Sequence, residues 1–332
     1  MIKTIKKRIL AVAVLGLLLT GCVSQLEKKP VQYDDEIVLT NGIVRLGVSP
    51  SIGRIVSFGK VGSRDLLWRN SVADLNAVRQ QGRGWLNYGG DKLWPGVQDS
   101  WERIFGRQWP PVEAVDGKKW EVIERSTLRI VIESQYINML QAKIRREIVL
   151  ADGKAAVVIT NTLDRFSNSP FPVCLWSITQ IKAPVYCLLD IDEKRPASNN
   201  SYIDFEGDNP NTSLLLKGKV LKFFARQGQR NKIGTFGKWI AAVYPDCIFL
   251  QSTDYSPGGC YPDNASLECY WDDLVEDMNN KLWNPKYAEL ELLGVSRHIR
   301  PGEKIRNVVR WKIIDNPKKE DAVIARLCNE SI

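Results

Sequence analysis

The chain has 332 residues but only one histidine, His298. A zinc protease of the His-Glu-x-x-His type needs two imidazoles on one helix, so that class is excluded. No two of the seven cysteines have the Cys-x-x-Cys spacing of zinc knuckles and thioredoxin-like redox sites. We therefore predict no metal site and no organic cofactor.

The sequence also lacks an apolar run long enough to span a bilayer, which takes about 20 residues. The longest run, Ile9–Leu19, follows a cationic start made of Lys3, Lys6, Lys7 and Arg8. It ends in Leu19-Thr20-Gly21-Cys22, which resembles a bacterial lipobox, where a signal peptidase cuts before a cysteine that then carries acyl chains. We predict a lipoprotein signal peptide at 1–21, lipidation of Cys22 and a polar tether at 22–35. The alternative is an uncleaved anchor with a chance cysteine.

The residues after Cys22 indicate the destination. Neither Val23 nor Ser24 is the Asp that often retains bacterial lipoproteins in the inner membrane, so we expect an outer-membrane lipoprotein on the periplasmic or cell-surface side. The signal holds four of the positive charges, which reduces the net charge from +8 to +4 in the mature chain. No concentrated basic stripe follows, so we predict no nucleic-acid partner.

Six cysteines remain after Cys22. An exported protein can form disulfides, and six cysteines allow fifteen full pairings. Three of them, Cys174, Cys187 and Cys247, lie in apolar runs, where free thiols pack as small hydrophobes. Both interpretations stay open.

The rest of the chain is composed of short apolar runs separated by turns, with Asn41-Gly42 as a strong hairpin signal. Helical periodicity is confined to Ser71–Gln81 and to the tail after Asn316-Pro317. Many strands without alternating helices indicate an all-β sandwich or barrel. We predict one β domain over 36–315 and a C-terminal helix in 316–332. The expected strands are 37–40, 43–48, 54–58, 120–124, 128–136, 142–150, 155–162, 173–181, 220–224, 239–244, 247–252, 287–295 and 304–313.

Three stretches together resemble the galactose mutarotase (aldose epimerase) superfamily. They are the opening Leu39–Ile55, the central strand Val158–Leu163, and the ending Glu289–Trp311 with its Arg300-Pro301-Gly302-Glu303 turn. The stretch Tyr88–Pro95 is more specifically similar to the uncharacterised bacterial DUF4380 family of this fold. The resemblance implies a single large β-supersandwich.

The superfamily mechanism implies a Glu that takes the anomeric hydroxyl proton and a His that acts as acid at the ring oxygen. Glu291 matches the Glu, and Glu289 shares its face if the segment is a strand. The acid His is missing, because Leu175–Gln180 occupies its place and His298 follows the Glu strand. Lys92, Asp91 or Tyr88 could supply a substitute acid.

Six of the eleven tryptophans lie between residues 68 and 120, in a segment rich in Gly and Pro. Flat aromatic faces beside polar groups suit sugars, although the same tryptophans could simply cap the sandwich. We place a ligand site between the loop 88–107 and the strand of Glu289 and Glu291. The predicted substrate-binding residues are Tyr88, Asp91, Lys92, Trp94, Arg103 and Glu289, with Glu291 as the catalytic candidate. Positive charge from Lys92, Arg103 and Arg107 leaves an acidic sugar open.

Three functions follow from these observations. The first is a membrane-anchored carbohydrate-binding lipoprotein of the bacterial envelope, because the fold pattern is intact and the acid His is absent. The second is a sugar mutarotase or epimerase with Glu291 as base and an acid other than His. The third is a structural envelope protein that binds another protein.

Overall fold

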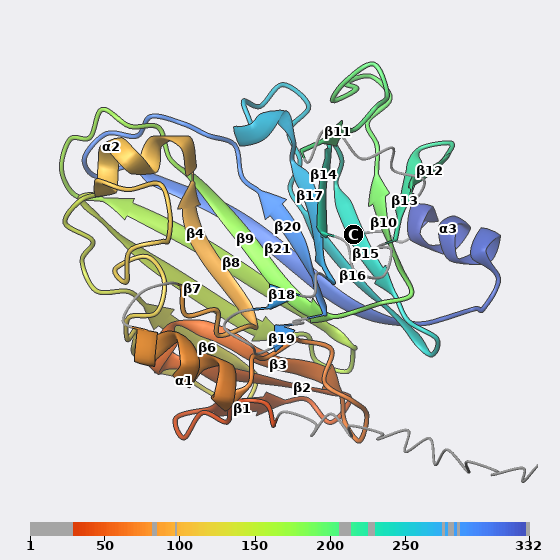
Figure 1. Ribbon diagram of the computed structural model, residues 1–332, viewed down its shortest axis with the longest axis horizontal. Helices are drawn as coiled ribbons and strands as arrows, with labels where there is room; N and C mark the ends of the chain where they lie inside the picture. Colours follow the sequence, from red (N-terminus) through yellow and green to blue (C-terminus); the bar gives the residue numbers. More distant parts are fainter. Residues whose placement is uncertain are drawn as a thin grey trace, which may run out of the picture.

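A computed structural model describes residues 29–81, 85–96, 98–205, 214–224, 230–273, 276–277, 282–283 and 286–329 (Figure 1). The predicted signal peptide and Cys22 lie outside these residues. Among the described residues, no helix is long and apolar enough to cross a membrane.

Two large antiparallel sheets, with nine and ten strands, form the molecule (Figure 1). The nine-stranded sheet has the order β1-β2-β3-β4-β9-β20-β17-β14-β11, and the ten-stranded sheet has the order β12-β13-β10-β15-β16-β21-β8-β7-β6-β5. The strands of the first sheet are β1 (Ile37–Thr40), β2 (Val44–Ser49), β3 (Arg54–Lys60), β4 (Asp91–Gly96), β9 (Cys174–Lys182), β20 (Tyr287–Leu293), β17 (Leu267–Asp272), β14 (Arg230–Thr235) and β11 (Ile203–Asp204). Those of the second are β12 (Leu214–Lys217), β13 (Val220–Phe223), β10 (Tyr186–Asp190), β15 (Trp239–Val243), β16 (Cys247–Thr253), β21 (Lys304–Asp315), β8 (Ala156–Arg165), β7 (Ala142–Leu150), β6 (Arg129–Glu133) and β5 (Glu121–Arg125). A short pair, β18 (Glu276–Asp277) and β19 (Leu282–Trp283), stands apart.

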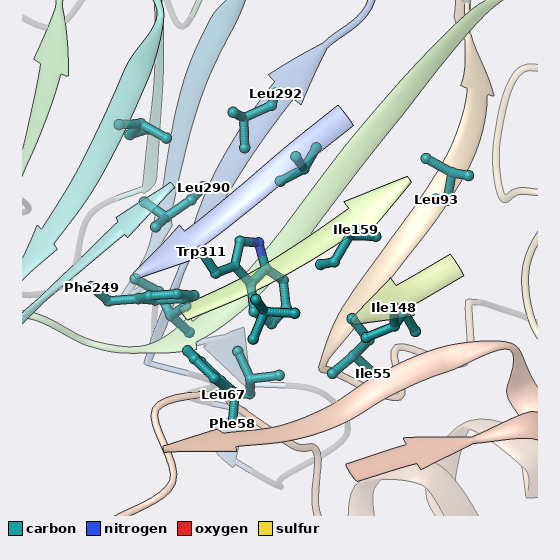
Figure 2. Close-up of a cluster of buried hydrophobic side chains, with 14 of the residues drawn as sticks. Ile55, Phe58, Leu67, Leu93, Ile148, Ile159, Phe249, Leu290, Leu292 and Trp311 are labelled. Atoms are coloured by element: carbon teal, nitrogen blue, oxygen red, sulfur yellow. The ribbon is translucent and has the colours of Figure 1, made fainter. Parts of the chain in front are cut away.

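The main hydrophobic core lies between the two sheets (Figure 2). Its centre is Trp311 on β21, which contacts the rings of Phe58 on β3 and Phe249 on β16 at centroid distances of 5.3 and 5.4 Å. Leu290 and Leu292 of β20 also point into this core. Because side chains alternate along a strand, Glu289 and Glu291 emerge on the opposite, outer face of the nine-stranded sheet.

The helices are few and peripheral. They are α1 (Val72–Gln81), α2 (Trp101–Phe105) and α3 (Glu320–Asn329), with 3-10 turns η1 (Pro50–Ile52), η2 (Gln98–Ser100) and η3 (Pro262–Asn264). Val323 and Leu327 of α3 pack with Leu188, Trp239 and Leu250, so α3 covers part of the outer face of the ten-stranded sheet. The sequence prediction of an all-β sandwich with a short C-terminal helix is confirmed.

The segment predicted as one long loop, 88–107, contains the strand β4. Asp, Lys, Pro and Gly disfavour strands, which is why the sequence conceals it. The strand forms because β4 pairs along its whole length with β9, from Asp91 opposite Thr179 to Gly96 opposite Cys174. Pairing with β3 is limited to Asp91 opposite Ile55. The rest of β4 makes no backbone hydrogen bonds to β3, so that side of the strand tolerates Pro95, which has no N–H to donate.

Two further features bear on the sequence analysis. Part of the segment expected to be a tether lies against the domain: the Val31 N–H donates to the Asn70 carbonyl at 2.9 Å, and the Tyr33 hydroxyl donates to the Tyr88 carbonyl at 3.2 Å.

The six described cysteines are free thiols. Those in apolar runs, Cys174, Cys187 and Cys247, are buried, as the packing interpretation expects.

Candidate functional site

A pocket of about 190 Å³ opens on the outer face of the nine-stranded sheet. We call it the aromatic pocket. The strands β4, β9, β20, β17 and β14 form its floor, and the chain before and after β4 supplies the rest of its wall. The lining residues are Trp85, Lys92, Trp94, Gln98, Trp109, Trp176, Ile178, Lys232, Tyr270, Tyr287, Glu289 and Glu291.

The pairing register of β4, β9, β20 and β17 places residues from all four strands side by side on the floor of the aromatic pocket. Lys92 lies opposite Ile178, Ile178 lies opposite Glu291, and Glu291 lies opposite Glu268. Directly opposed residues share a face of the sheet. Charges that are far apart in the sequence therefore form one row on the outer face, and Lys232 on β14 reaches into it.

Trp94 is the hub of the aromatic wall. Its ring makes edge contacts with Trp85, Trp109 and Trp176 at centroid distances of 5.9, 6.1 and 5.6 Å. Trp101 packs behind it, and its Nε1–H donates to the Pro95 carbonyl at 2.9 Å. Trp109 is 50% exposed and forms the rim. The tryptophans thus form a connected aromatic wall, with one ring available at the surface.

One charged group of the floor is Lys232 between two buried carboxylates. Its Nζ lies 2.6 Å from Glu268 Oε2 and 3.3 Å from Glu291 Oε2. Burial opposes the charged form of Lys232, but the two carboxylates outweigh burial and raise the pKa of the ammonium. Burial also raises the pKa of Glu268 and of Glu291. Repulsion from Glu291 adds to the shift of Glu268, and repulsion from Glu289 adds to the shift of Glu291. The Trp176 Nε1–H donates to Glu291 Oε2 at 2.8 Å and fixes that carboxylate.

The second charged group is Lys92 with Glu289. Lys92 Nζ donates to Glu289 Oε1 at 3.1 Å, and Gln180 Nε2 donates to the same oxygen at 2.7 Å. The ammonium lies 4.6 and 4.5 Å from the ring centroids of Trp85 and Trp94. Burial lowers the pKa of Lys92, and the neighbouring Glu289 only partly opposes this.

Two buried polar atoms of the pocket residues have no hydrogen-bond partner among the described residues. They are Glu291 Oε1, an acceptor, and Trp94 Nε1, a donor. The two side chains are 1% and 3% exposed. A buried polar atom without a partner is costly and is rare in folded proteins, so each needs an explanation.

Asp91 lies on the other side of β4 from Lys92, between the sheets. It pairs with Arg146, and both side chains are fully buried. Thr179 Oγ1 donates to Asp91 Oδ2 at 2.8 Å, and Arg146 Nε donates to Asn161 Oδ1 at 3.0 Å. This core network lies directly beneath the aromatic pocket.

The structure therefore brings together four of the predicted site residues: Lys92, Trp94, Glu289 and Glu291. Three others do not line the aromatic pocket. Asp91 is in the core, the ring of Tyr88 faces Arg54, and Arg103 is exposed on α2 beside the ring of Phe171. His298 is exposed elsewhere on the surface.

The sequence analysis did not identify Lys232, Trp176, Tyr270 and Tyr287 as site residues. Lys232 and Tyr270 belong to β14 and β17, which were not predicted as strands. Trp176 and Tyr287 lie on predicted strands, and alternation from Glu289 would have placed Tyr287 on the same face. No three His, Cys, Asp or Glu side chains of the described residues are grouped as ligands for a metal ion.

No protein-family model matches the sequence, and no curated protein is similar to it. Solved structures do share its fold. A candidate aldose 1-epimerase from Escherichia coli K12 has a TM-score of 0.56 at 13% identity, covering 85% of this chain and 99% of its own. A galactose mutarotase-like protein from Lactobacillus casei has a TM-score of 0.56 at 10% identity, covering 84% and 99%.

A candidate mutarotase from Salmonella typhimurium has a TM-score of 0.54 at 11% identity, covering 86% of this chain and 93% of its own. These likenesses extend over most of both chains in each case. At such low identity they establish the architecture alone. The two antiparallel sheets and these neighbours together show that the chain has the galactose mutarotase-like fold.

Proposed function

We propose that the protein binds carbohydrate and holds one sugar ring in the aromatic pocket. The observation that carries the proposal is the pair of unpartnered atoms, Glu291 Oε1 and Trp94 Nε1, inside an aromatic wall. A sugar hydroxyl both donates and accepts hydrogen bonds, so one ring can satisfy an acceptor and a donor together. The C–H faces of the same ring stack on indole surfaces.

The size of the aromatic pocket supports a small ligand. Its volume of about 190 Å³ is below the roughly 300–1,000 Å³ of pockets for drug-sized molecules. The fold neighbours from Escherichia coli and Lactobacillus casei are a candidate aldose 1-epimerase and a galactose mutarotase-like protein, which agrees with a sugar ring.

The charges of the aromatic pocket favour a neutral sugar. Both of its lysines already have carboxylate partners, since Lys92 contacts Glu289 and Lys232 contacts Glu268 and Glu291. Arg103 and Arg107 do not line it. A uronic acid would add a carboxylate beside Glu289 and Glu291, which costs free energy.

A calorimetric titration with glucose, galactose and galacturonic acid tests the proposal. We expect one of the neutral sugars to bind and Glu291→Gln to weaken it by about 10- to 100-fold, the scale of a hydrogen bond to a charged group. The matched control is Glu102→Gln, an exposed carboxyl on α2 outside the pocket. If a broad panel of neutral sugars does not bind, or if both variants weaken binding equally, the proposal fails.

A second candidate, a sugar mutarotase or epimerase, is favoured by the opposite pKa shifts of Glu291 and Lys92. Burial raises the pKa of the carboxyl and lowers the pKa of the ammonium, so both move toward neutral pH. General acid–base catalysis works best with such groups. We propose Glu291 as the base for the anomeric hydroxyl and Lys92 as the acid at the ring oxygen.

Exchange NMR between sugar anomers distinguishes catalysis from binding. In the enzyme case the protein speeds exchange, and Lys92→Met abolishes the acceleration while the sugar still binds. Binding without any acceleration by the wild-type protein rejects the epimerase and keeps the carbohydrate-binding function.

We also propose that the protein is an outer-membrane lipoprotein anchored through acyl chains on Cys22, and that it belongs with the DUF4380 family. The lipobox-like Leu19–Cys22 sequence supports the anchor. Labelling of growing cells with an alkyne palmitate analogue tests it: the protein should be labelled and membrane-bound, and Cys22→Ser should abolish both. Label retained in that variant would refute acylation at Cys22.

A further inference from the structure

A second hollow lies away from the aromatic pocket and shares no lining residue with it. It consists of two cavities of about 750 and 400 Å³ that both have Asp254 in their walls. The larger one lies at the ends of β10 and β16 beside the last turn of α3, and the smaller one follows the start of β21. We call the two cavities together the basic groove.

Cations outnumber acids in the wall of the basic groove by seven to four, an excess of three positive charges. The mature chain has a formal charge of only +4, so this is a local concentration. The cations are Lys194, Arg195, Lys219, Lys238, Arg297, Arg306 and Arg310, and the acids are Asp190, Asp192, Glu193 and Asp254.

Only two of these cations form ion pairs among the described residues: Lys219 with Glu193 at 3.0 Å and Arg310 with Asp254 at 2.8 Å. Lys194, Lys238 and Arg297 are exposed and have no carboxylate within ion-pair distance in that part of the chain. Exposed cations without a partner keep their charge available for a ligand.

Arg195 is fixed in place without a counter-ion. Its Nη1 donates to the carbonyls of Pro257 and Gly259 at 2.6 and 2.8 Å, and its guanidinium lies 3.7 Å from the centroid of the Phe236 ring. A guanidinium has five N–H donors, so donors remain for a ligand. Because two carbonyls and a ring already hold Arg195, little side-chain entropy is lost when it binds an anion.

The basic groove contains both cations and carboxylates, and this mixture favours one class of polyanion over another. A nucleic acid carries a phosphate at every nucleotide and binds best to an uninterrupted basic surface, whereas four carboxylates interrupt this one. An acidic oligosaccharide has one carboxylate per ring with hydroxyls in between. Its carboxylates can meet Arg195 and Lys238, while its hydroxyls donate to Asp190 and Asp254. Tyr255, also in the wall and half-buried, offers a ring surface to a sugar.

We propose that the basic groove is a second carbohydrate site, which binds an acidic oligosaccharide of the uronate type. This site is independent of the neutral sugar in the aromatic pocket. A protein with both sites would hold a charged glycan chain in the groove and a separate neutral ring in the pocket.

Titration with trigalacturonate at 20 mM and 200 mM NaCl tests this proposal, with the fully methyl-esterified trisaccharide as the uncharged matched ligand. We expect the acid to bind about tenfold more tightly than the ester at low salt, and the preference to shrink at high salt because exposed charges are screened. The double variant Lys194→Glu/Lys238→Glu should lose about tenfold in affinity for the acid, since exposed charge pairs are weak individually. Its fold is checked by thermal unfolding, and the double variant Lys119→Glu/Lys154→Glu, which makes the same change in net charge at two exposed lysines outside both sites, is the control.

The other outcomes overturn the proposal. Equal binding of the acid and the ester excludes a site that recognises the carboxylates. Equal loss of affinity with Lys119→Glu/Lys154→Glu shows only an effect of net charge. Equally tight binding of a single-stranded DNA oligonucleotide identifies a general polyanion surface. The titration repeated with Glu291→Gln distinguishes the two sites: loss of trigalacturonate binding in that variant would assign the signal to the aromatic pocket.

Discussion

The aromatic pocket and the basic groove use charge in opposite ways. In the aromatic pocket, Lys92 and Glu291 are buried and Lys232 is half-buried, and each contacts a partner of opposite charge. In the basic groove, Lys194 and Lys238 are exposed and form no ion pair within the described residues. The first arrangement defines a shape and a pattern of hydrogen bonds, and the second creates a field that attracts anions.

The difference follows from solvation. A buried ion must be paired because its desolvation costs several kcal/mol, so removal of one partner is severe. An exposed ion costs little and contributes little to stability, but it acts over roughly 10 Å at moderate salt. Substitutions under or in the aromatic pocket should therefore affect folding, whereas substitutions in the basic groove should affect only binding.

The largest expected effect comes from Arg146, whose ion pair with Asp91 lies beneath the aromatic pocket. Arg146→Met leaves Asp91 buried without a counter-ion and should cost about 3–5 kcal/mol of unfolding free energy. Arg145→Met is the matched control on the same strand, because Arg145 is partly exposed and pairs with Glu133 at the surface. Urea unfolding should show a cost below about 1 kcal/mol for the control. Similar costs for both variants would contradict the contrast between buried and exposed charge.

The second-largest expected effect on stability compares two packed tryptophans, of which one has a hydrogen-bonded indole N–H and the other does not. Trp94→Phe removes an unpartnered donor, while Trp101→Phe removes a donor that is bonded to Pro95. Ring shrinkage is common to both variants, so Trp101→Phe should be the less stable by about 1–2 kcal/mol. In calorimetry, Trp94→Phe should weaken the binding of the neutral sugar. If Trp94→Phe unfolds more easily than Trp101→Phe, Trp94 Nε1 has a partner in the folded protein.

A third effect is the pH dependence of stability caused by Glu268. Burial raises the pKa of this carboxyl above its ordinary value of 4.5. Between that value and its raised pKa the folded state holds more protons than the unfolded chain, so this carboxyl makes stability fall as pH rises. The slope contributed by one proton is at most about 1.4 kcal/mol per pH unit.

Glu268→Gln should therefore flatten the decline above pH 4.5, as urea unfolding at a series of pH values would show. Glu102→Gln, at an exposed position, should leave the slope unchanged. A steeper decline in Glu268→Gln would mean that attraction to Lys232 outweighs burial.

The smallest effect is expected in the basic groove. Lys238→Gln should change the unfolding free energy by no more than about 0.5 kcal/mol, as for ordinary surface substitutions. Lys232→Gln makes the same chemical change in the aromatic pocket, where Glu268 and Glu291 would lose their cation, and should be clearly destabilising. Thermal unfolding of the two variants side by side measures the difference. Equal shifts would show that burial does not separate the two regions.

Much of the strand pattern could be predicted from the sequence, including β9 and β20 at the centre of the pocket floor, but the strands on either side of them could not. Apolar alternation indicated β7 and β20, and Asn41-Gly42 marked the first hairpin. In contrast, β14 and β17 carry Lys232, Glu268 and Tyr270 on their outer face, and β4 contains Asp91, Lys92 and Pro95. These three strands carry polar or turn-type residues where a recognisable strand has apolar alternation, whereas β20 keeps that alternation and was recognised despite Glu289 and Glu291.

The resemblance and the tryptophan-rich segment indicated Glu291, Glu289, Lys92 and Trp94, and the structure places these four in one pocket. Their role in binding or catalysis stays a prediction. Asp91 was expected to bind ligand as one of the polar groups of the tryptophan-rich segment. In a strand, however, adjacent residues point to opposite faces, so Asp91 contributes to the core and Lys92 to the pocket.

The sequence by itself determined the fold class, because the alternation of apolar residues and the turn residues between them are local properties that need no partner. It also fixed the single histidine, and with it the need for some other acid if the protein is an enzyme. Only the tertiary structure decided that Glu291 contacts Lys232 and Trp176, and that Lys92 is buried between two indole rings. Lys232 and Trp176 lie 59 and 115 residues from Glu291 in the sequence, and cross-strand register, which no local pattern encodes, brings these three together.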